Sequence, residues 1–273
     1  MSTSIKQPGL LRPTLAQRVV VADGAMGTML QAANPTLEDF QNHEGCNEIL
    51  NVSRPDIVRS VHNEYLAAGV DAIETNTFGA NWSNLADYGI EDRIYELAFA
   101  GGKIAREAAD SFSTKDKPRF VLGSLGPGTK LPSLGHTTYE NLKTAYYTAA
   151  KGLSDSECDA LLVETSQDLL QVKAAVNGCR QAINETDRDI MLIAQVTVET
   201  TGTMLLGSEI GAALNTLEPM GIDLIGLNCA TGPTEMSEHL RYLSKNAKIA
   251  ISVMPNAGLP VLGANGASYP LGP

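Results

Sequence analysis

VVVADGAMGT, residues 19–28, is the stretch of this sequence that decides the fold. The apolar run 19–22 predicts a buried strand, which ends at the acidic residue Asp23 and a glycine-containing turn. Glycine lets backbone N–H groups approach a ligand without a Cβ in between. In α/β proteins, the carboxyl ends of parallel strands are where binding and catalytic groups collect. The stretch therefore predicts the first strand of an α/β fold and the first part of its site.

Four later stretches repeat this pattern of an apolar strand followed by polar or glycine residues. They are ETNT at 74–77, GSLGPG at 123–128, ET at 164–165 and GLNC at 226–229. One such strand end is an ordinary turn into a loop. Parallel strands place their carboxyl ends at one edge of a sheet, so five in succession predict a single active-site face.

Short β-rich runs alternate with amphipathic helical patterns along the whole chain. Strands separated by helices need right-handed crossovers and a parallel sheet. Seven strands in about 250 residues favour a (β/α)8 TIM-type barrel over a six-stranded dinucleotide-binding fold. The first strand is also not followed by the GxGxxG turn that a dinucleotide-binding fold needs. The candidate strands are 19–23, 71–76, 119–125, 159–164, 190–198, 223–228 and 248–254.

The predicted barrel is one strand short. After 248–254 the sequence continues as a Gly-, Ala- and Pro-rich loop to residue 273, without an eighth strand or the last helices. A barrel left open at this point exposes two strand edges, which natural proteins avoid. Residues 1–18, which precede the first candidate strand, are expected to form an N-terminal extension. Residues 19–273 are expected to form one α/β barrel domain, incomplete with about seven strands and truncated at its C-terminal end.

Composition excludes several classes of partner. The 273 residues carry 31 Asp and Glu against 20 Lys and Arg, a net charge of −11, and no basic cluster that would bind nucleic acid. No apolar stretch reaches the roughly 18 residues that a membrane span needs. The N-terminus has no hydrophobic signal segment. The sequence thus predicts a cytoplasmic protein without nucleic-acid or membrane partners, in which disulfides are not expected.

Cys229 is the candidate reactive thiol. A cysteine is usually a small buried hydrophobic residue, and we expect that of Cys46, Cys158 and Cys179. Cys229, however, lies at the carboxyl end of the sixth candidate strand, next to Asn228. This position indicates a nucleophile or a metal-binding thiolate, and no histidine has the spacing of a Cys–His pair.

Two strand-end carboxylates, Asp23 and Glu164, are candidates for holding an ammonium group or for general base catalysis. Helix capping or a surface salt bridge is the alternative. The turn after Asp23 is of the kind that forms an anion-binding nest of backbone N–H groups, which could hold a carboxylate. An α-amino acid would satisfy both features. The predicted substrate-binding residues are Asp23, Gly24, Ala25, Met26, Glu74, Asn76, Ser124, Glu164 and Asn228.

Together these motifs resemble the homocysteine-binding barrel that opens the cobalamin-dependent methionine synthases. The resemblance runs from about residue 19 to the last residue. It implies a homocysteine S-methyltransferase in which three cysteine thiolates hold zinc and homocysteine is the fourth ligand. It also implies that the methyl group comes from methylcobalamin on another domain and is replenished by methyltetrahydrofolate on a further one. The motifs are DGAMGT (23–28), CNE (46–48) with RPD (54–56), ETNTFG (74–79), GLNC (226–229) and PNAGLP (255–260).

The resemblance further implies roles for individual residues. Cys229 matches the first zinc ligand, while Asp23, Glu164 and the backbone of residues 24–26 match the positions that hold the amino acid. The other two ligands of the family are adjacent cysteines in a GGCCGT-like segment, which this chain lacks. One thiolate cannot form a tetrahedral zinc site, so we expect the chain alone to be inactive.

Two alternatives stay open at this stage. One is a stand-alone homocysteine S-methyltransferase that takes its methyl group from betaine or S-methylmethionine. The other is a non-catalytic protein that keeps only the amino-acid pocket. Downstream folate- and cobalamin-binding domains would exclude the first, and amino-acid binding without metal would favour the second. An unrelated barrel lyase rests on fold analogy alone.

Overall fold

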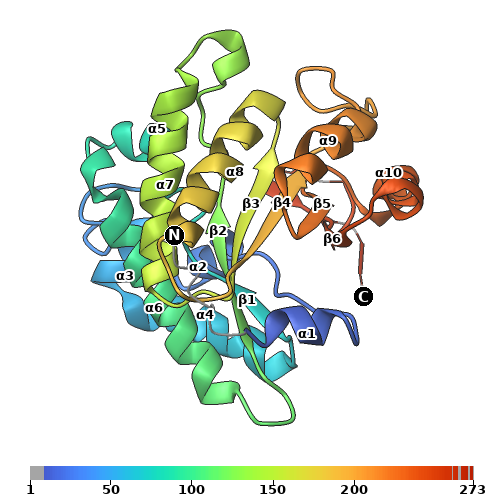
Figure 1. Cartoon of the computed structure of the whole chain (residues 1–273). Coiled ribbons are helices and arrows are strands. Elements are labelled where there is room, and N and C mark those ends of the chain that lie inside the picture. The colour runs from blue at the N-terminus through green and yellow to red at the C-terminus, as the bar shows by residue number, and fades with distance from the viewer. Residues whose placement is uncertain (1–8, 260, 264–265, 270, 273) are drawn as a thin grey trace.

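A curled parallel sheet of six strands is the centre of the fold (Figure 1). The computed structural model describes residues 9–259, 261–263, 266–269 and 271–272. Each strand pairs in parallel with the next along the chain, so the sheet order is the chain order. The strands are β1 (Ala72–Glu74), β2 (Phe120–Leu125), β3 (Ala160–Ser166), β4 (Met191–Val196), β5 (Leu224–Asn228) and β6 (Ala250–Met254).

Helices connect the strands and cover the outer face of the sheet (Figure 1). The long helices are α4 (Pro55–Ala68), α6 (Ile94–Phe112), α7 (Tyr139–Asp155), α8 (Leu169–Asn184), α9 (Ile210–Leu217) and α10 (Pro233–Asn246). The short helices are α1 (Leu11–Leu15), α2 (Gly27–Ala32), α3 (Leu50–Ser53) and α5 (Trp82–Ala86). Four 3-10 turns cover Asn47–Ile49, Glu91–Arg93, Pro132–Leu134 and Glu218–Met220, and β7 (Val261–Gly263) pairs with β8 (Gly266–Ser268) in antiparallel fashion.

Local sequence explains where the helices begin and end. Pro55 occupies the first turn of α4, and Gly69 ends that helix with a left-handed φ of 108°. The hydroxyl of Thr138 accepts a hydrogen bond from the Asn141 N–H and caps α7. Asp168 caps α8 in the same way. None of the helices in the described part of the chain is long and apolar enough to cross a membrane.

The prediction of about seven strands is wrong by one, because residues 19–23 do not form a full strand. They lie beside β1 but make only one isolated bridge, between Ala22 and Ala72. The Val21 carbonyl accepts the Ala72 N–H at 3.1 Å, and the Asp23 N–H donates to the Ala72 carbonyl at 3.0 Å. On the other side of this segment the described residues place no strand, and Val19 is 81% exposed. The segment is therefore stabilised from one side only, by a strand of three residues.

The inner face of the sheet changes character along its strands. At the amino end it is apolar, with Leu122, Leu162, Ile193 and Leu224 packed against Leu11 of α1. Side chains alternate across a strand, so the next inward residues on these strands lie two positions further on. Ser124 and Glu164 follow Leu122 and Leu162 in this way. The inward side chains Ser124 and Glu164, at the carboxyl end of the sheet, are thus polar.

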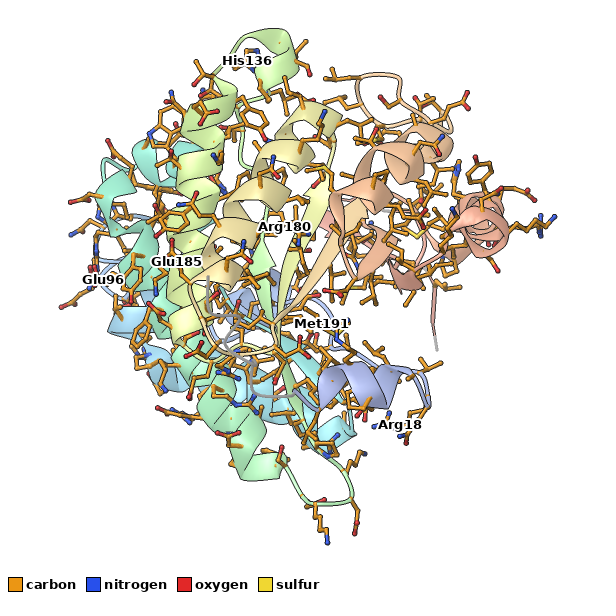
Figure 2. The ribbon with its side chains drawn as sticks, viewed as in Figure 1. Arg18, Glu96, His136, Arg180, Glu185 and Met191 are labelled. Carbon is orange, nitrogen blue, oxygen red and sulfur yellow. The ribbon has the colours of Figure 1, made fainter. Side chains whose placement is uncertain are left out.

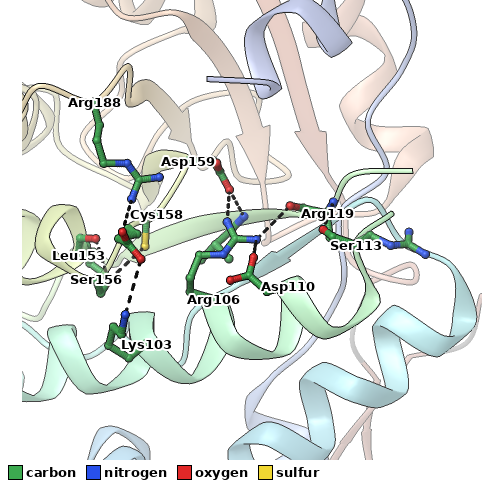
Figure 3. A network of polar contacts seen from close by, with 12 residues as sticks. Lys103, Arg106, Asp110, Ser113, Arg119, Leu153, Ser156, Cys158, Asp159 and Arg188 are labelled. Atoms are coloured by element: carbon green, nitrogen blue, oxygen red, sulfur yellow. Dashed lines mark hydrogen bonds and ion pairs between the residues drawn. The ribbon is translucent and has the colours of Figure 1, made fainter. Parts of the chain in front are cut away.

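Ion pairs connect helices and strands at the amino end of the sheet. Arg106 of α6 contacts Asp159, just before β3, at 2.8 Å and Asp110 at 2.7 Å, and it donates to the Arg119 carbonyl at 3.2 Å (Figure 3). Arg18 pairs with Asp71 at 2.7 Å.

Figure 2 shows Arg18 and His136, which is in the loop after β2, at opposite ends of the molecule. The charge pairs and the carboxyl-end loops are therefore well separated.

Candidate functional site

A cavity of about 850 Å³ opens at the carboxyl end of the sheet. It is bounded by the ends of β1, β2, β3 and β5, by the turn at 23–28 and by residues 253–257. All ten site residues that the sequence predicts line it, although they come from five separate segments. They are Asp23, Gly24, Ala25, Met26, Glu74, Asn76, Ser124, Glu164, Asn228 and Cys229.

Glu164, 6% exposed, is the best-anchored carboxylate of the cavity. Its Oε1 accepts a hydrogen bond from the Ser124 hydroxyl at 2.6 Å, and its Oε2 accepts one from Asn228 Nδ2 at 3.1 Å. Burial raises the pKa of Glu164 to about 7, against the opposing effect of the Ser124 hydrogen bond. The carboxylate is thus fixed in one orientation at the end of β3.

Two more carboxylates face the same cavity. Both oxygens of Asp23 accept the Glu74 N–H, at 3.0 and 3.1 Å, and burial raises the pKa of Asp23 to about 8. The pKa of Glu74 is raised well above its usual value by burial and by the charges of Glu164 and Asp23. Within the described residues, the Glu74 carboxylate makes no hydrogen bond. Asp23, Glu74 and Glu164 are therefore three neighbouring carboxyl groups that resist simultaneous ionisation.

The described lining of the cavity contains no lysine, arginine or histidine. Buried carboxylates need protons or a positive charge to balance them. A ligand with an ammonium group would supply that charge. The site is therefore suited to a cationic group beside Asp23, Glu74 and Glu164.

The turn after Asp23 adds a second kind of contact. Tyr65 of α4 donates its hydroxyl to the Ala25 carbonyl at 3.0 Å and thereby orients this turn. The N–H groups of Gly24, Ala25 and Met26 make no hydrogen bond to other described residues, and these three residues line the cavity. Free N–H groups next to a cavity are suited to a carboxylate.

Cys229 contributes a partly exposed thiol, whereas the other three cysteines are buried and unpaired. Cys229 and Ala230 both have left-handed backbones, with φ values of 57° and 56°. The Sγ atom lies 3.4 Å from Asn228 Nδ2 and 3.8 Å from the Thr165 hydroxyl. Burial raises the pKa of the Cys229 thiol, and the hydrogen bond from Thr165 opposes this.

Asn76 lines the cavity but uses its amide elsewhere. Its Nδ2 donates to the Asn47 carbonyl at 2.8 Å and to Asn51 Oδ1 at 3.0 Å. Asn51 in turn donates to the Asn76 carbonyl at 2.8 Å. This side chain therefore connects the end of β1 with the 3-10 turn at Asn47–Ile49 and with α3. We assign it a structural contact in addition to its place in the lining.

Sequence reasoning missed two residues of this region. Glu48 lines the cavity, is 7% exposed and accepts the Gly79 N–H at 2.6 Å. The CNE motif contained it, but no role was predicted. Thr165 lies directly after Glu164 and contacts both Asn228 and Cys229. The signal for it was the polar ET pair at the end of a strand, of which only the carboxylate was used.

Sequence reasoning also missed a side-chain hydrogen bond that spans three strands. Gln195 of β4 donates to the Ser252 hydroxyl of β6 at 2.7 Å, passing over β5. Gly226, the residue of β5 paired with both, leaves the room for this contact. A Cβ atom at position 226 would lie 2.0 Å from the Ser252 carbonyl oxygen.

Zinc does not fit the residues present. The described residues contain no group of three or more His, Cys, Asp or Glu side chains placed to hold a metal ion. Cys229 supplies one of the four ligands of a tetrahedral site. Cys46, Cys158 and Cys179 are buried, and none of them lines the cavity. We therefore derive no chemical step through zinc from this chain.

Comparisons with known proteins give matches in sequence and in structure. The chain is 64% identical to a methionine synthase of Mycobacterium tuberculosis (strain H37Rv) and 63% identical to that of Mycobacterium leprae, in both cases over 96% of the chain. It spans about a fifth, 22%, of the length of these relatives. The solved Escherichia coli homocysteine methyltransferase MmuM, in its metallated form, superposes with a TM-score of 0.76 over 91% of this chain and 87% of that one. Its sequence identity is 22%, so this likeness concerns the fold.

The family itself follows from a match that covers nearly the whole chain. The family model described as homocysteine S-methyltransferase matches residues 20–273. The chain belongs to the homocysteine S-methyltransferase family.

Proposed function

We propose that this chain is the homocysteine-binding module of a methionine synthase, with residues 19–273 as part of its barrel domain after an extension at 1–18. The observation that carries the proposal is one cavity that combines three carboxylates, a turn with free N–H groups and a partly exposed thiol. Membership of the homocysteine S-methyltransferase family and 64% identity to a methionine synthase support it.

Each part of homocysteine has a counterpart in the cavity. We assign the α-ammonium group to Asp23 and Glu164, with Glu74 contributing further negative charge. We assign the α-carboxylate to the N–H groups of residues 24–26, in the turn that follows Asp23. The thiol of the substrate is assigned to the side of the cavity where Cys229 lies. Substrate recognition by this chain then needs no metal.

The reaction proposed for the whole protein is methyl transfer from methylcobalamin, replenished by methyltetrahydrofolate, to homocysteine. Zinc and cobalamin are the proposed cofactors, with Cys229 as one zinc ligand. Two further thiolates must come from outside this chain, because the described residues provide one at this place. The cobalamin and folate domains are the proposed partners, and the length of the relatives leaves room for them.

Calorimetry in metal-free buffer tests the amino-acid pocket, which this proposal shares with the non-catalytic alternative; folate- and cobalamin-binding domains in the whole protein separate the two. Reduced L-homocysteine should bind the 273-residue chain, and 4-mercaptobutyrate, which lacks the amino group, should not. The variant Asp23→Asn should lose binding, whereas Asp92→Asn on the exposed surface should retain it. Equal binding of both ligands would overturn the assignment. The chain alone should form no methionine from methylcobalamin, and robust formation would contradict the expected lack of zinc ligands.

A further inference from the structure

We propose that Thr165 is a positioning residue, which holds the Asn228 side chain and through it orients the Glu164 carboxylate and the Cys229 thiol toward the cavity. The contacts involved are all internal to the chain. The inference rests on the proposed function in one respect, because the ligand used to test it is the proposed amino acid.

Thr165 has an unusual backbone. Its φ is 56°, in the left-handed region that β-branched residues rarely adopt. The pairing of β3 with β4 shifts register between Val163 and Ser166, so Thr165 lies in an irregularity of the strand. Such strained residues persist where the surrounding structure determines them, and they cluster at functional sites. The consequence here is that the N–H and the hydroxyl of Thr165 both face Asn228.

These two groups determine the orientation of the Asn228 amide. The Thr165 N–H donates to Asn228 Oδ1 at 2.8 Å, and Asn228 Nδ2 donates to the Thr165 hydroxyl at 2.8 Å. A backbone N–H is only a donor, so it must face the oxygen of the amide. The opposite orientation would set an NH2 group against an N–H group. Asn228 is 2% exposed, so water does not take over either contact.

The fixed amide then acts on the two groups that face the cavity. Its Nδ2 donates to Glu164 Oε2 at 3.1 Å and lies 3.4 Å from Cys229 Sγ. The Thr165 hydroxyl, which accepts from Nδ2, has one hydrogen to donate, and its two acceptors are Cys229 Sγ at 3.8 Å and the Glu164 carboxyl. Thr165 is on β3 and Cys229 follows β5, with β4 between them. The Thr165 hydroxyl therefore links the ends of β3 and β5, which are not neighbours in the sheet.

Three variants of the chain test this role. Thr165→Val removes the hydroxyl and keeps the branched shape, Thr165→Ala removes both, and Thr165→Ser keeps the hydroxyl. Thr200→Val, in the exposed loop after β4, is the matched control. The measurements are the Kd for L-homocysteine in metal-free buffer, the exchange rate of the Asn228 side-chain NH2 protons by NMR, and the rate at which iodoacetamide alkylates Cys229. Cys229 reports cleanly because the other three cysteines are buried.

We expect Thr165→Val and Thr165→Ala to bind homocysteine about tenfold more weakly, as the loss of a buried hydrogen bond implies. Both should also show faster exchange of the Asn228 NH2 protons and an altered alkylation rate of Cys229. Thr165→Ser should stay within about twofold of the wild type, and so should Thr200→Val. If Thr165→Val fails to fold, Thr165→Ala supplies the same comparison without the branched side chain.

Two outcomes would count against the inference. Unchanged NH2 exchange and alkylation in a folded Thr165→Val or Thr165→Ala protein would overturn it. So would a Thr165→Ser protein as defective as Thr165→Val, because the hydroxyl would then not be the active group. If the wild type does not bind homocysteine, the proposed function fails, while the exchange and alkylation rates still decide the role of Thr165.

Discussion

The two ends of the sheet treat their carboxylates in opposite ways. At the amino end, aspartates that precede strands are paired with arginines at 2.7–2.8 Å; the pairs are Asp71 with Arg18, Asp159 with Arg106, and Asp223 with Arg12. At the carboxyl end, Asp23, Glu74 and Glu164, together with Glu48, line a cavity whose described lining has no basic side chain. Charge at one end therefore serves the fold, and we propose that charge at the other end serves a ligand.

Asp71 and Asp23 also differ in pKa, whereas at Asp159 burial outweighs the charge of Arg106 and raises the pKa. Burial of Asp71 raises its pKa, but hydrogen bonds from Arg18 and the Val21 N–H outweigh this, so the pKa ends below its usual value. Burial of Asp23 raises its pKa to about 8, and no arginine compensates. Ionisation of Asp71 therefore stabilises the folded state, whereas ionisation of Asp23 destabilises it.

The largest expected effect comes from breaking a charge pair at the amino end. Arg106→Ala should lower the free energy of unfolding by about 3 kcal/mol, because it leaves Asp159 buried without its partner. Urea unfolding followed by circular dichroism measures this. Arg241→Ala, which breaks an exposed pair with Glu238, should change stability by less than about 0.5 kcal/mol. Equal effects would show that the amino-end pairs do not carry the fold.

A carboxylate at the other end should behave in the reverse sense. Glu164→Gln should weaken homocysteine binding about 30-fold, since hydrogen bonds to charged groups contribute about 2 kcal/mol. The same change should leave stability at pH 7 unchanged or raised, because it removes one of three mutually repelling carboxylates. Calorimetry and urea unfolding on the same protein separate the two quantities. A Glu164→Gln protein that loses stability while binding normally would remove the contrast between the ends.

The pH dependence of stability sharpens the comparison. The raised pKa values of Asp23, about 8, and Glu164, about 7, mean that the folded state binds more protons than the unfolded state above about pH 4. The stability that these groups contribute is thus fully present below about pH 4 and is lost as the pH rises toward 8. Between pH 5 and 8 the wild type should lose about 1–2 kcal/mol more than Glu164→Gln does. Parallel stability curves for the two proteins would contradict the raised pKa of Glu164.

The smallest expected effect concerns the turn beside the carboxylates. Tyr65→Phe removes the hydroxyl that binds the Ala25 carbonyl and should weaken homocysteine binding about threefold, in keeping with one neutral hydrogen bond. Tyr242→Phe, on the exposed face of α10, is the matched control and should have no effect on binding. Calorimetry with the same ligand measures both. Identical affinities for the two variants would argue against a role for the turn.

Much of the fold could be predicted because strand ends carry a strong local signal. The six strands of the sheet lie within the predicted ranges or extend them by up to two residues, and all ten predicted residues line one cavity. Their roles in binding stay predictions. The stretch 19–23 was wrong both as a full strand and as a buried one, because β1 gives it only three residues to pair with and Val19 and Val21 are exposed. An apolar run shows what a segment can bury, whereas burial and strand formation both need partners.

The parts of the site that could not be predicted depend on contacts across the sheet. Thr165 acquires its contacts because a register shift turns it toward Asn228, which lies 63 positions away. The amide of Asn76 is hydrogen-bonded to Asn47 and Asn51, which the structure places in a 3-10 turn and in α3. No local pattern contains such information. What the sequence does show is the set of polar residues among which these contacts form.

Gly226 has a consequence for sequence variation. Any side chain there would collide with the backbone of the neighbouring strand, since even a Cβ would lie 2.0 Å from the Ser252 carbonyl oxygen. A library randomised over residues 224–229 should therefore return glycine at this position under selection for folding alone. Cys229, in contrast, should give way under that selection to other residues that tolerate its left-handed backbone, and should become fixed only when catalysis by the proposed whole protein is demanded. Two positions three residues apart would thus record two different histories of selection.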